Sequence, residues 1–246
     1  MLPDGEVLRI HPKWRSLSWN LTEYRAFKNA VSPGAQALDV GANLGAYSLL
    51  ISQWVGPSGH VHAFEPNPQV SAGLERHVSM NHLEDRVTIV RKAVSDREMN
   101  CFFTFGDSIG SGRLEDRAAP HSREDRVLVE SISLDGFCRQ RGILPQFVKI
   151  DVEGAEFEVL RGARDLMRSL GRSLRCFVEL HPSIWIGQGR GKKDWSALLD
   201  ELSLAMVMIA PGFDPWHEEG VCVELVPKSS AAASETAVPG EITDRQ

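Results

Sequence analysis

The stretch Leu38–Tyr47, with the sequence LDVGANLGAY, decides the fold of this chain. The residues up to Val40 read as a buried strand, Gln36–Val40, and a helical pattern follows from Ala46 to Val55. Between them, Gly41 and Gly45 allow a sharp backbone turn and the close approach of a ligand. The free N–H groups at the start of the helix point toward that ligand. The stretch therefore predicts a ligand-binding loop between a strand and a helix.

The loop departs from the dinucleotide fingerprint G-x-G-x-x-G, because Asn43 stands in place of the second glycine. Its side chain adds bulk where a pyrophosphate must approach the backbone. Asp39 would repel a pyrophosphate but suits a cationic ligand such as S-adenosylmethionine, which carries a sulfonium and an ammonium group. Glu65 follows the next predicted strand, where a carboxylate can accept hydrogen bonds from both ribose hydroxyls. The alternative is that Asp39 and Glu65 merely cap helices.

Short apolar runs alternate with helical patterns along residues 34–227, which indicates βαβ units around a parallel sheet. The expected strands are 36–40, 60–64, 86–94, 100–105, 127–132, 147–152, 175–180, 205–209 and 221–226, the last two as candidate antiparallel partners. The expected helices are 46–55, 68–82, 134–141, 155–170 and 195–202.

Three segments lie outside this regular pattern. Residues 1–33 hold Trp14, Trp19, Tyr24 and Phe27 and predict a cap that packs on the domain. The polar stretch 106–126 predicts a substrate lid, with a disordered insertion or a short hairpin as alternatives. Residues 228–246 have almost no large apolar side chains, so we expect a disordered tail.

A second informative run is Lys149–Glu156, with the sequence KIDVEGAE. Alternate side chains of a strand share a face, so Lys149, Asp151 and Glu153 are expected to point together near the end of a buried strand. Buried charges are costly unless they are paired or functional. The alternative, which fits Glu156 best, is that these acids stabilise the start of the following helix through its dipole.

Glu179 and His181 share a face at the end of the strand 175–180. An acid and an imidazole beside Asp151 predict a general base with an orienting partner. Asp151 or His181 is the candidate base, and Glu153 or Glu179 its orienter. Two alternatives remain open for His181: a ligand of a divalent metal, or a structural histidine.

Composition narrows the class of protein. The 246 residues include 33 acidic and 27 basic ones, a net charge of −6 that lacks the basic footprint of a nucleic-acid-binding protein. The longest apolar run, Leu202–Ala210, falls far short of the ~20 residues of a membrane span, and the first residues do not resemble a secretory signal. The four cysteines form no metal-binding pairs and predict no disulfide framework. We expect a cytoplasmic protein with neither a nucleic acid nor a membrane as partner.

Three segments together resemble the FkbM-type S-adenosylmethionine-dependent methyltransferases. They are DVGANLGAYSLLISQWVGPSGHVHAFEPNP (39–68), VKIDVEGAEFEVLRGA (148–163) and VELHP (178–182), in that order, and the similarity runs from about Leu38 to Pro182. The resemblance implies an α/β, Rossmann-like class I methyltransferase fold. Such a fold is a three-layer, doubly wound, mostly parallel seven-stranded sheet whose last strand is antiparallel.

The resemblance also implies the chemistry: methyl transfer from S-adenosylmethionine to a hydroxyl of a sugar, polyketide or other natural-product small molecule. Asp151 and Glu153 would lie near the methyl group, with Glu179 and His181 as further catalytic candidates. The acceptor pocket would be built by residues 108–126, the N-terminal cap and the residues after Ile184. The cofactor contacts would be Asp39, Gly41, Ala42, Asn43, Gly45, Glu65, Pro66, Asn67 and Ala93.

Other functions compete with this interpretation. One is a nucleotide-dependent oxidoreductase, against which Asn43 and the acidic cluster argue. Another is a cofactor-binding partner protein without catalysis, against which the complete set Asp39, Glu65, Asp151 and His181 argues. A nucleic-acid methyltransferase would carry an Asn-Pro-Pro-aromatic or catalytic-cysteine motif, and the sequence has neither.

Overall fold

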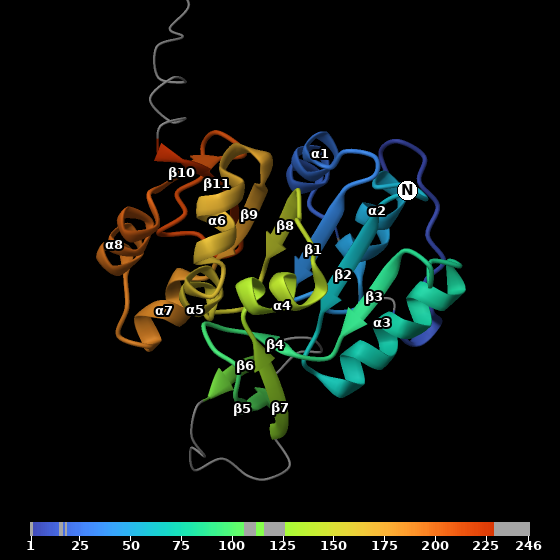
Figure 1. Cartoon of the computed structure of the whole chain (residues 1–246), viewed down its shortest axis with the longest axis horizontal. Helices are drawn as coiled ribbons and strands as arrows, with labels where there is room; N and C mark the ends of the chain where they lie inside the picture. Colours follow the sequence, from blue (N-terminus) through green and yellow to red (C-terminus); the bar gives the residue numbers. More distant parts are fainter. Residues whose placement is uncertain (1, 15–16, 18, 106–111, 116–125, 229–246) are drawn as a thin grey trace, which may run out of the picture.

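A seven-stranded sheet forms the centre of the protein, in the order β10-β11-β9-β8-β1-β2-β3 (Figure 1). The computed structural model describes residues 2–14, 17, 19–105, 112–115 and 126–228. Neighbouring strands pair in parallel except β11, which runs antiparallel to both β9 and β10. The predicted α/β sheet with an antiparallel last strand is thereby confirmed. The strands are β1 Gln36–Val40, β2 His60–Phe64, β3 Val87–Val90, β8 Phe147–Ile150, β9 Arg175–Leu180, β10 Leu204–Met208 and β11 Val221–Pro227.

Helices cover both faces of this sheet and complete the three layers. One apolar core joins the sheet to α1 (Leu21–Ala30), α2 (Ala46–Trp54) and α3 (Pro68–Met80). A second core joins the opposite face to α4 (Leu134–Arg141), α5 (Glu156–Arg161), α6 (Arg164–Leu170), α7 (Pro182–Gly187) and α8 (Lys192–Leu202). Short 3-10 turns lie at Pro12–Trp14 and Gly171–Ser173.

The N-terminal segment packs against the first core through α1. Asn20 caps this helix by accepting hydrogen bonds from the backbone N–H groups of Thr22 and Glu23. Tyr24 and Phe27 are fully buried, and the Phe27 ring contacts Phe147 and Phe177 edge-on, beneath the central strands. This packing places α1 beside the ends of β1 and β9, where Glu23 becomes part of the site described below.

A second, four-stranded sheet has the order β4-β7-β5-β6 and lies below the main sheet in Figure 1. Its strands are β4 Ala93–Val94, β5 Asn100–Phe105, β6 Gly112–Glu115 and β7 Arg126–Ile132. The expected single strand 86–94 is therefore wrong. The chain turns after Val90, and Ala93 and Val94 pair with β7 instead of continuing β3.

The expected lid at 106–126 contains β6, which pairs antiparallel with β5 as the hairpin alternative requires. Residues 106–111 and 116–125 lie outside the described residues, so the lid itself stays a prediction. The same holds for residues 229–246 of the expected tail.

The expected helix over 155–170 is wrong as one element, because it consists of α5 and α6. The break lies at Gly162, where a Cβ atom would sit 2.1 Å from the carbonyl oxygen of Ser95. Glycine at this position therefore allows the segment around Ser95 to pack closely against the break. All four cysteines are buried and free, and no helix among the described residues is long and apolar enough to cross a membrane.

Candidate active site

The site lies at the point where the order of the parallel strands reverses. The chain goes from β1 to β2 on one side of the sheet and from β8 to β9 on the other, and open α/β sheets bind ligands at the crevice between such halves. Gly41 follows β1 and Asp151 follows β8. A Cβ atom on Gly41 would lie 1.7 Å from the carbonyl oxygen of Asp151, and the φ of Gly41 is +77°. Only glycine therefore fits at this crossing.

The loop after β1 alternates into the left-handed region at Gly41, Asn43 and Gly45, with φ values of +77°, +49° and +90°. Asparagine adopts this conformation more readily than most side chains, which explains how Asn43 replaces a glycine. The backbone N–H of Asn43 donates to Glu65 Oε2 at 3.0 Å, and that of Asn67 donates to Glu65 Oε1 at 2.8 Å. Glu65 thus ties the loop to the end of β2.

Glu65 is buried, with 4% of its surface exposed. Burial raises the pKa of its carboxyl to about 7, against the lowering effect of the two backbone hydrogen bonds. The residues that cap α2 and α3 are Gly45 and Asn67. The helix-capping alternative is therefore wrong for both Asp39 and Glu65.

A first cleft of about 610 Å³, open to solvent, lies beside this loop. It contains five of the nine expected cofactor residues. Asp151, Glu153 and Phe103 of β5 line it as well. The five cofactor residues are Gly41, Asn43, Glu65, Pro66 and Ala93.

A second cleft of about 980 Å³ shares Gly41, Asn43 and Asp151 with the first and continues toward α1. Asp39, Ala42, Lys149 and Glu179 line it. The N-terminal segment contributes Leu17, Asn20 and Glu23 to the same cleft, as expected of a cap that helps to build a binding pocket.

Asp39 is fully buried at the floor of the second cleft. Its Oδ2 accepts a hydrogen bond from the Ser48 hydroxyl, and its Oδ1 lies 3.7 Å from Lys149 Nζ without a hydrogen bond among the described residues. Burial raises the pKa of Asp39, while Lys149 and Ser48 lower it. The cation that faces Asp39 in the structure is thus Lys149, a partner that the sequence analysis did not assign to it.

Lys149 also contacts Asp151, with Nζ 3.1 Å from Oδ2. This pair confirms that the two side chains lie together at the end of β8. The expected strand through Glu153 is wrong, because β8 ends at Ile150 and Glu153 lies in a turn with φ +46°. The two-residue alternation of a strand no longer applies there, although Glu153 still lines the first cleft.

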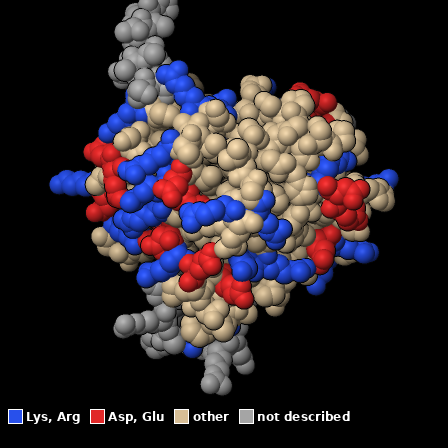
Figure 2. Space-filling model, in the orientation of Figure 1, with Lys and Arg blue, Asp and Glu red and all other residues tan. Residues whose placement is uncertain are grey.

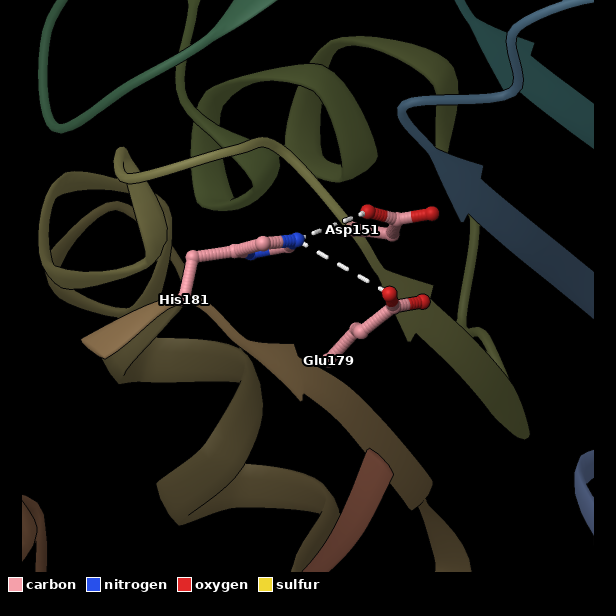
Figure 3. Close-up of side chains that lie close together, drawn as sticks. All are labelled: Asp151, Glu179 and His181. Carbon is pink, nitrogen blue, oxygen red and sulfur yellow. Dashed lines mark ion pairs between the residues drawn. The ribbon is translucent and has the colours of Figure 1, made fainter. Parts of the chain in front are cut away.

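His181 lies between two carboxylates from different strands (Figure 3). Its Nε2 is 3.8 Å from Asp151 Oδ1 and 3.8 Å from Glu179 Oε1. Its Nδ1 donates to Glu156 Oε1 at 2.7 Å. The structure therefore brings together three of the four expected catalytic residues, and the hydrogen bond that orients His181 comes from Glu156 rather than from Glu153 or Glu179.

Glu156 is completely buried and accepts two further hydrogen bonds. The Trp185 indole donates to Oε2 at 2.6 Å, and the backbone N–H of Gly154 donates to Oε1 at 3.0 Å. The sequence analysis explained Glu156 by the helix dipole and did not predict these contacts. Trp185 itself is buried and stacks on Trp195 with ring centroids 4.9 Å apart, so both indoles pack in the core.

The charged groups in this cluster shift the pKa values of one another. Burial alone would lower the pKa of His181, but the Glu156 hydrogen bond and the nearby carboxylates raise it to about 9. Burial, followed by repulsion from Asp151, raises the pKa of Glu179 to about 8. Burial opposes the charge on Lys149, yet Asp151 and Asp39 hold its pKa above the ordinary value. In the free protein, His181 and Lys149 are therefore both cationic at neutral pH.

Glu23 is a further site residue that sequence reasoning missed. It is 5% exposed, its Oε2 accepts the Tyr47 hydroxyl, and burial raises its pKa. The missing signal is tertiary, because nothing in the N-terminal sequence indicates that α1 reaches the carboxyl ends of β1 and β9.

The surface beyond the clefts carries both signs of charge. On the face drawn in Figure 2, basic side chains gather over α5, α6 and α8, and acidic side chains lie among them. The described residues of this face thus form a surface of mixed charge. Ion pairs that involve α4, α6 and α8 join Arg139 to Asp165, Arg164 to Glu201 and Lys228 to Asp200.

Comparison with known proteins gives one family. The model of that family, described as the methyltransferase FkbM domain, matches residues 39–206. Hexuronic acid methyltransferase AglP of Haloferax volcanii is 29% identical over 168 residues, which cover 68% of this chain and 62% of AglP.

Solved structures are similar at the level of the fold. An rRNA methylase of Streptococcus thermophilus aligns over 83% of this chain and 93% of its own, with 8% identity and a TM-score of 0.50. The methyltransferase FkbM of Methylobacillus flagellatus KT aligns over 83% of this chain and 51% of its own, with 14% identity and a TM-score of 0.49. The chain thus spans less than two thirds of the length of both AglP and the Methylobacillus protein.

Proposed function

This chain belongs to the FkbM methyltransferase family, and we propose that it transfers a methyl group from S-adenosylmethionine to a hydroxyl of a sugar. The observation that carries the proposal is the position of the Asp151–Glu179–His181 cluster. Asp151 lines both clefts, directly beside the Gly41 loop, so a methyl group held by that loop lies next to the cluster.

The cofactor is S-adenosylmethionine, held across the two clefts. Glu65 lies where its carboxylate would accept hydrogen bonds from the ribose hydroxyls. Pro66 and Ala93 line the far part of the first cleft and suit the adenine. Asp39 and the loop from Gly41 to Gly45 would hold the methionine portion, whose cationic groups face an excess of carboxylates.

Methyl transfer is an in-line displacement. The acceptor oxygen forms a bond to the methyl carbon, the bond from carbon to sulfur breaks, and its electron pair stays on sulfur. Oxygen and methyl carbon must be held about 3–3.5 Å apart in the reactive geometry. The hydroxyl proton leaves to a base, which typically contributes ~10²–10⁴-fold to the rate.

Asp151 is the base that the electrostatics favour. Because the pKa of His181 is raised to about 9, its imidazole already carries a proton at neutral pH and cannot take another. Asp151 lies in the same cluster, faces both clefts, and is held in place by Lys149. His181 then acts by positioning Asp151 and Glu179.

An acidic sugar is the acceptor class that we propose to test first. AglP is a hexuronic acid methyltransferase by name. In this chain, a third cleft of about 1310 Å³ shares Glu153 and Ala155 with the first and is lined by Arg97, Arg161 and Arg190, with Asp96 and Glu158 among them. Arg190 pairs with Glu158 through Nη2, but its buried Nη1 has no hydrogen-bond partner among the described residues, and guanidinium groups bind carboxylates well.

The first test is calorimetric titration of S-adenosylmethionine into the purified chain, with NAD as control ligand. We expect binding of S-adenosylmethionine, loss of binding in Asp39→Ala and Glu65→Ala, and no binding of NAD. Circular dichroism of both variants verifies that they fold, and Glu65→Gln provides a milder change at the same position. Binding of NAD in place of S-adenosylmethionine would establish the oxidoreductase alternative.

The second test follows the methyl group. Chain and methyl-labelled S-adenosylmethionine are incubated with glucuronic acid, galacturonic acid, their glycosides and the matching neutral hexoses. We expect labelled acidic sugars whose label survives mild alkali, because a methyl ether is stable where a methyl ester is hydrolysed. Alkali-labile label would move the acceptor from hydroxyl to carboxylate. Cofactor binding without label in any sugar would refute the acceptor assignment.

A further inference from the structure

We propose that Asp151, Glu179 and His181 form a binding site for one divalent metal ion. One imidazole nitrogen and two carboxylate oxygens converge, all within 4.8 Å of one another. This mixed donor set suits first-row cations such as Mn²⁺ and Zn²⁺. The role of the ion in catalysis rests on the methyl transfer proposed above, whereas its binding does not.

The distances fit a bridging ion better than a direct ion pair. His181 Nε2 is 3.8 Å from both Asp151 Oδ1 and Glu179 Oε1. A charged imidazole in direct contact with a carboxylate would approach to about 2.7–2.9 Å. A metal ion with bonds of about 2.0–2.2 Å at angles of 90–109° holds its ligand atoms about 2.8–3.6 Å apart. Shortening these two distances by between a few tenths of an ångström and about 1 Å would therefore complete the site.

His181 is already oriented as a metal-binding histidine. Metal-bound histidines almost always donate their second ring N–H to a carboxylate or carbonyl, which fixes the tautomer. Here Nδ1 donates to the fully buried Glu156, and this leaves Nε2 directed at the two carboxylates. His181 is 9% exposed, and its Nε2 has no hydrogen bond within the described part of the chain.

The side chains around the cluster include more carboxyl groups than cationic groups, which favours the binding of a cation. Five carboxyl groups lie around the crossing of β1 and β8, against the cationic side chains of Lys149 and His181. S-adenosylmethionine adds a net charge of only one, because its own carboxylate offsets its ammonium. With all five groups ionised an excess of two negative charges remains, and a divalent ion, which displaces the proton from Nε2 as it binds, offsets half of it. The five groups are Glu23, Asp39, Asp151, Glu156 and Glu179.

The position gives the ion access to the acceptor. Asp151 lines both clefts and Glu179 lines the second, so open coordination positions would face the space beside the expected methyl group. An ion there would hold the acceptor oxygen in place and stabilise the negative charge that develops on it.

The test is titration of Mn²⁺ into the chelator-treated full chain without cofactor or acceptor, followed by electron paramagnetic resonance of the free ion and by calorimetry. We expect one Mn²⁺ per chain, displaced by Zn²⁺. Glu179→Gln and His181→Gln should lower the affinity at least 100-fold, and Glu156→Gln about 10–100-fold. Circular dichroism establishes that each variant is folded.

The matched control is His217→Ala, which removes an exposed histidine that is paired with Asp214 at 2.7 Å and lines none of the three clefts. We expect this variant to bind Mn²⁺ as the wild type does. No binding of Mn²⁺ or Zn²⁺ by the wild type would overturn the site. Binding that survives both Glu179→Gln and His181→Gln at the wild-type affinity would overturn it as well.

The two proposals can fail separately. Stoichiometric Mn²⁺ binding by a chain that transfers no methyl group, with or without the ion, would refute the proposed function and leave the metal site in place. Methyl transfer at the same rate before and after chelation, with no Mn²⁺ bound, would refute the metal site and leave the proposed function in place.

Discussion

The hydrogen bond between Glu156 and His181 makes a prediction that can be tested without any substrate. Glu156→Gln keeps the size of the side chain but removes the charge and one of the two acceptor oxygens. In metal-free wild type, His181 has a pKa of about 9 against the ordinary value of 6.5. In the variant, burial is opposed only by Asp151 and Glu179, so we expect the pKa to fall toward the ordinary value.

The sign of the effect on stability follows from linkage. The pKa of His181 is higher in the folded than in the unfolded chain, so protonation stabilises the fold fully below pH 6.5, and this stabilisation is lost as the pH rises through about 9. A difference between 6.5 and 9 corresponds to roughly 3 kcal/mol. Part of that amount survives in the variant, because Asp151 and Glu179 also favour the protonated imidazole.

The assay combines two measurements in chelator-containing buffer. Nuclear magnetic resonance follows the His181 ring proton from pH 5 to pH 10, with His181→Gln for its assignment. Denaturant unfolding at pH 6 and pH 10 gives the free energies of wild type and variant. We expect the variant to be less stable at pH 6 by several kcal/mol, since hydrogen bonds to charged groups contribute about 1.5–3 kcal/mol each. The gap between them should shrink by as much as about 3 kcal/mol at pH 10.

Glu158→Gln is the matched control for this prediction. Glu158 belongs to the same helix, α5, but pairs with Arg190 at 2.6 Å on a partly exposed side. Its substitution should leave the His181 titration unchanged and cost little stability. A wild-type His181 that titrates near 6.5, or a stability gap that does not change with pH, would refute this account of the site.

Three further predictions concern the crossing of β1 and β8. Gly41→Ala should unfold or severely destabilise the chain in thermal denaturation, because the added Cβ would lie 1.7 Å from the Asp151 carbonyl oxygen. In the control Gly56→Ala, the residue also has a positive φ of +68° but no atom lies within 4 Å of the added Cβ, so we expect a loss of only about 1–2 kcal/mol. Lys149→Met should lower the free energy of unfolding by about 3–5 kcal/mol in denaturant, because it leaves the buried Asp39 carboxylate unpaired. The double variant Lys149→Met with Asp39→Asn should recover part of that stability. A double variant no more stable than Lys149→Met would contradict the pairing. Affinity for S-adenosylmethionine, measured by calorimetry, should fall below about pH 7 as Glu65 takes up a proton, and Glu65→Gln should remove this dependence.

The sequence predicted most of the main sheet because its strands obey local rules. Gln36–Val40 and His60–Phe64 are apolar runs of strand length bounded by turn residues, and both occur in the structure with the expected bounds. The error at residues 86–94 has a physical origin. Apolar pattern marks Val87–Val90 and Ala93–Val94 alike as buried strand, but it does not reveal that the second pair joins β7 in another sheet.

The same limit applies within the site. Strand alternation places Lys149 beside Asp151, and Glu179 near His181, because each pair lies within or next to one strand. It fails at Glu153 as soon as the strand ends and the backbone turns to φ +46°. Sequence periodicity thus predicts which side chains lie together along a strand, and it gives no prediction beyond the end of the strand.

Glu156 shows why the supporting contacts lie beyond sequence reasoning. An acidic residue at the start of a helix is stabilised by the helix dipole, and this explanation predicts no further contacts for its carboxylate. The packing of α7 against α5 then brings Trp185 and His181, 29 and 25 residues further along the chain, onto its two oxygens. A solvated carboxylate at a helix start would tolerate replacement by glutamine, whereas a buried one that fixes the ring of His181 would not. The behaviour of Glu156→Gln beside Glu158→Gln therefore separates the local explanation from the tertiary one, on two acids that the sequence alone places in the same helical turn.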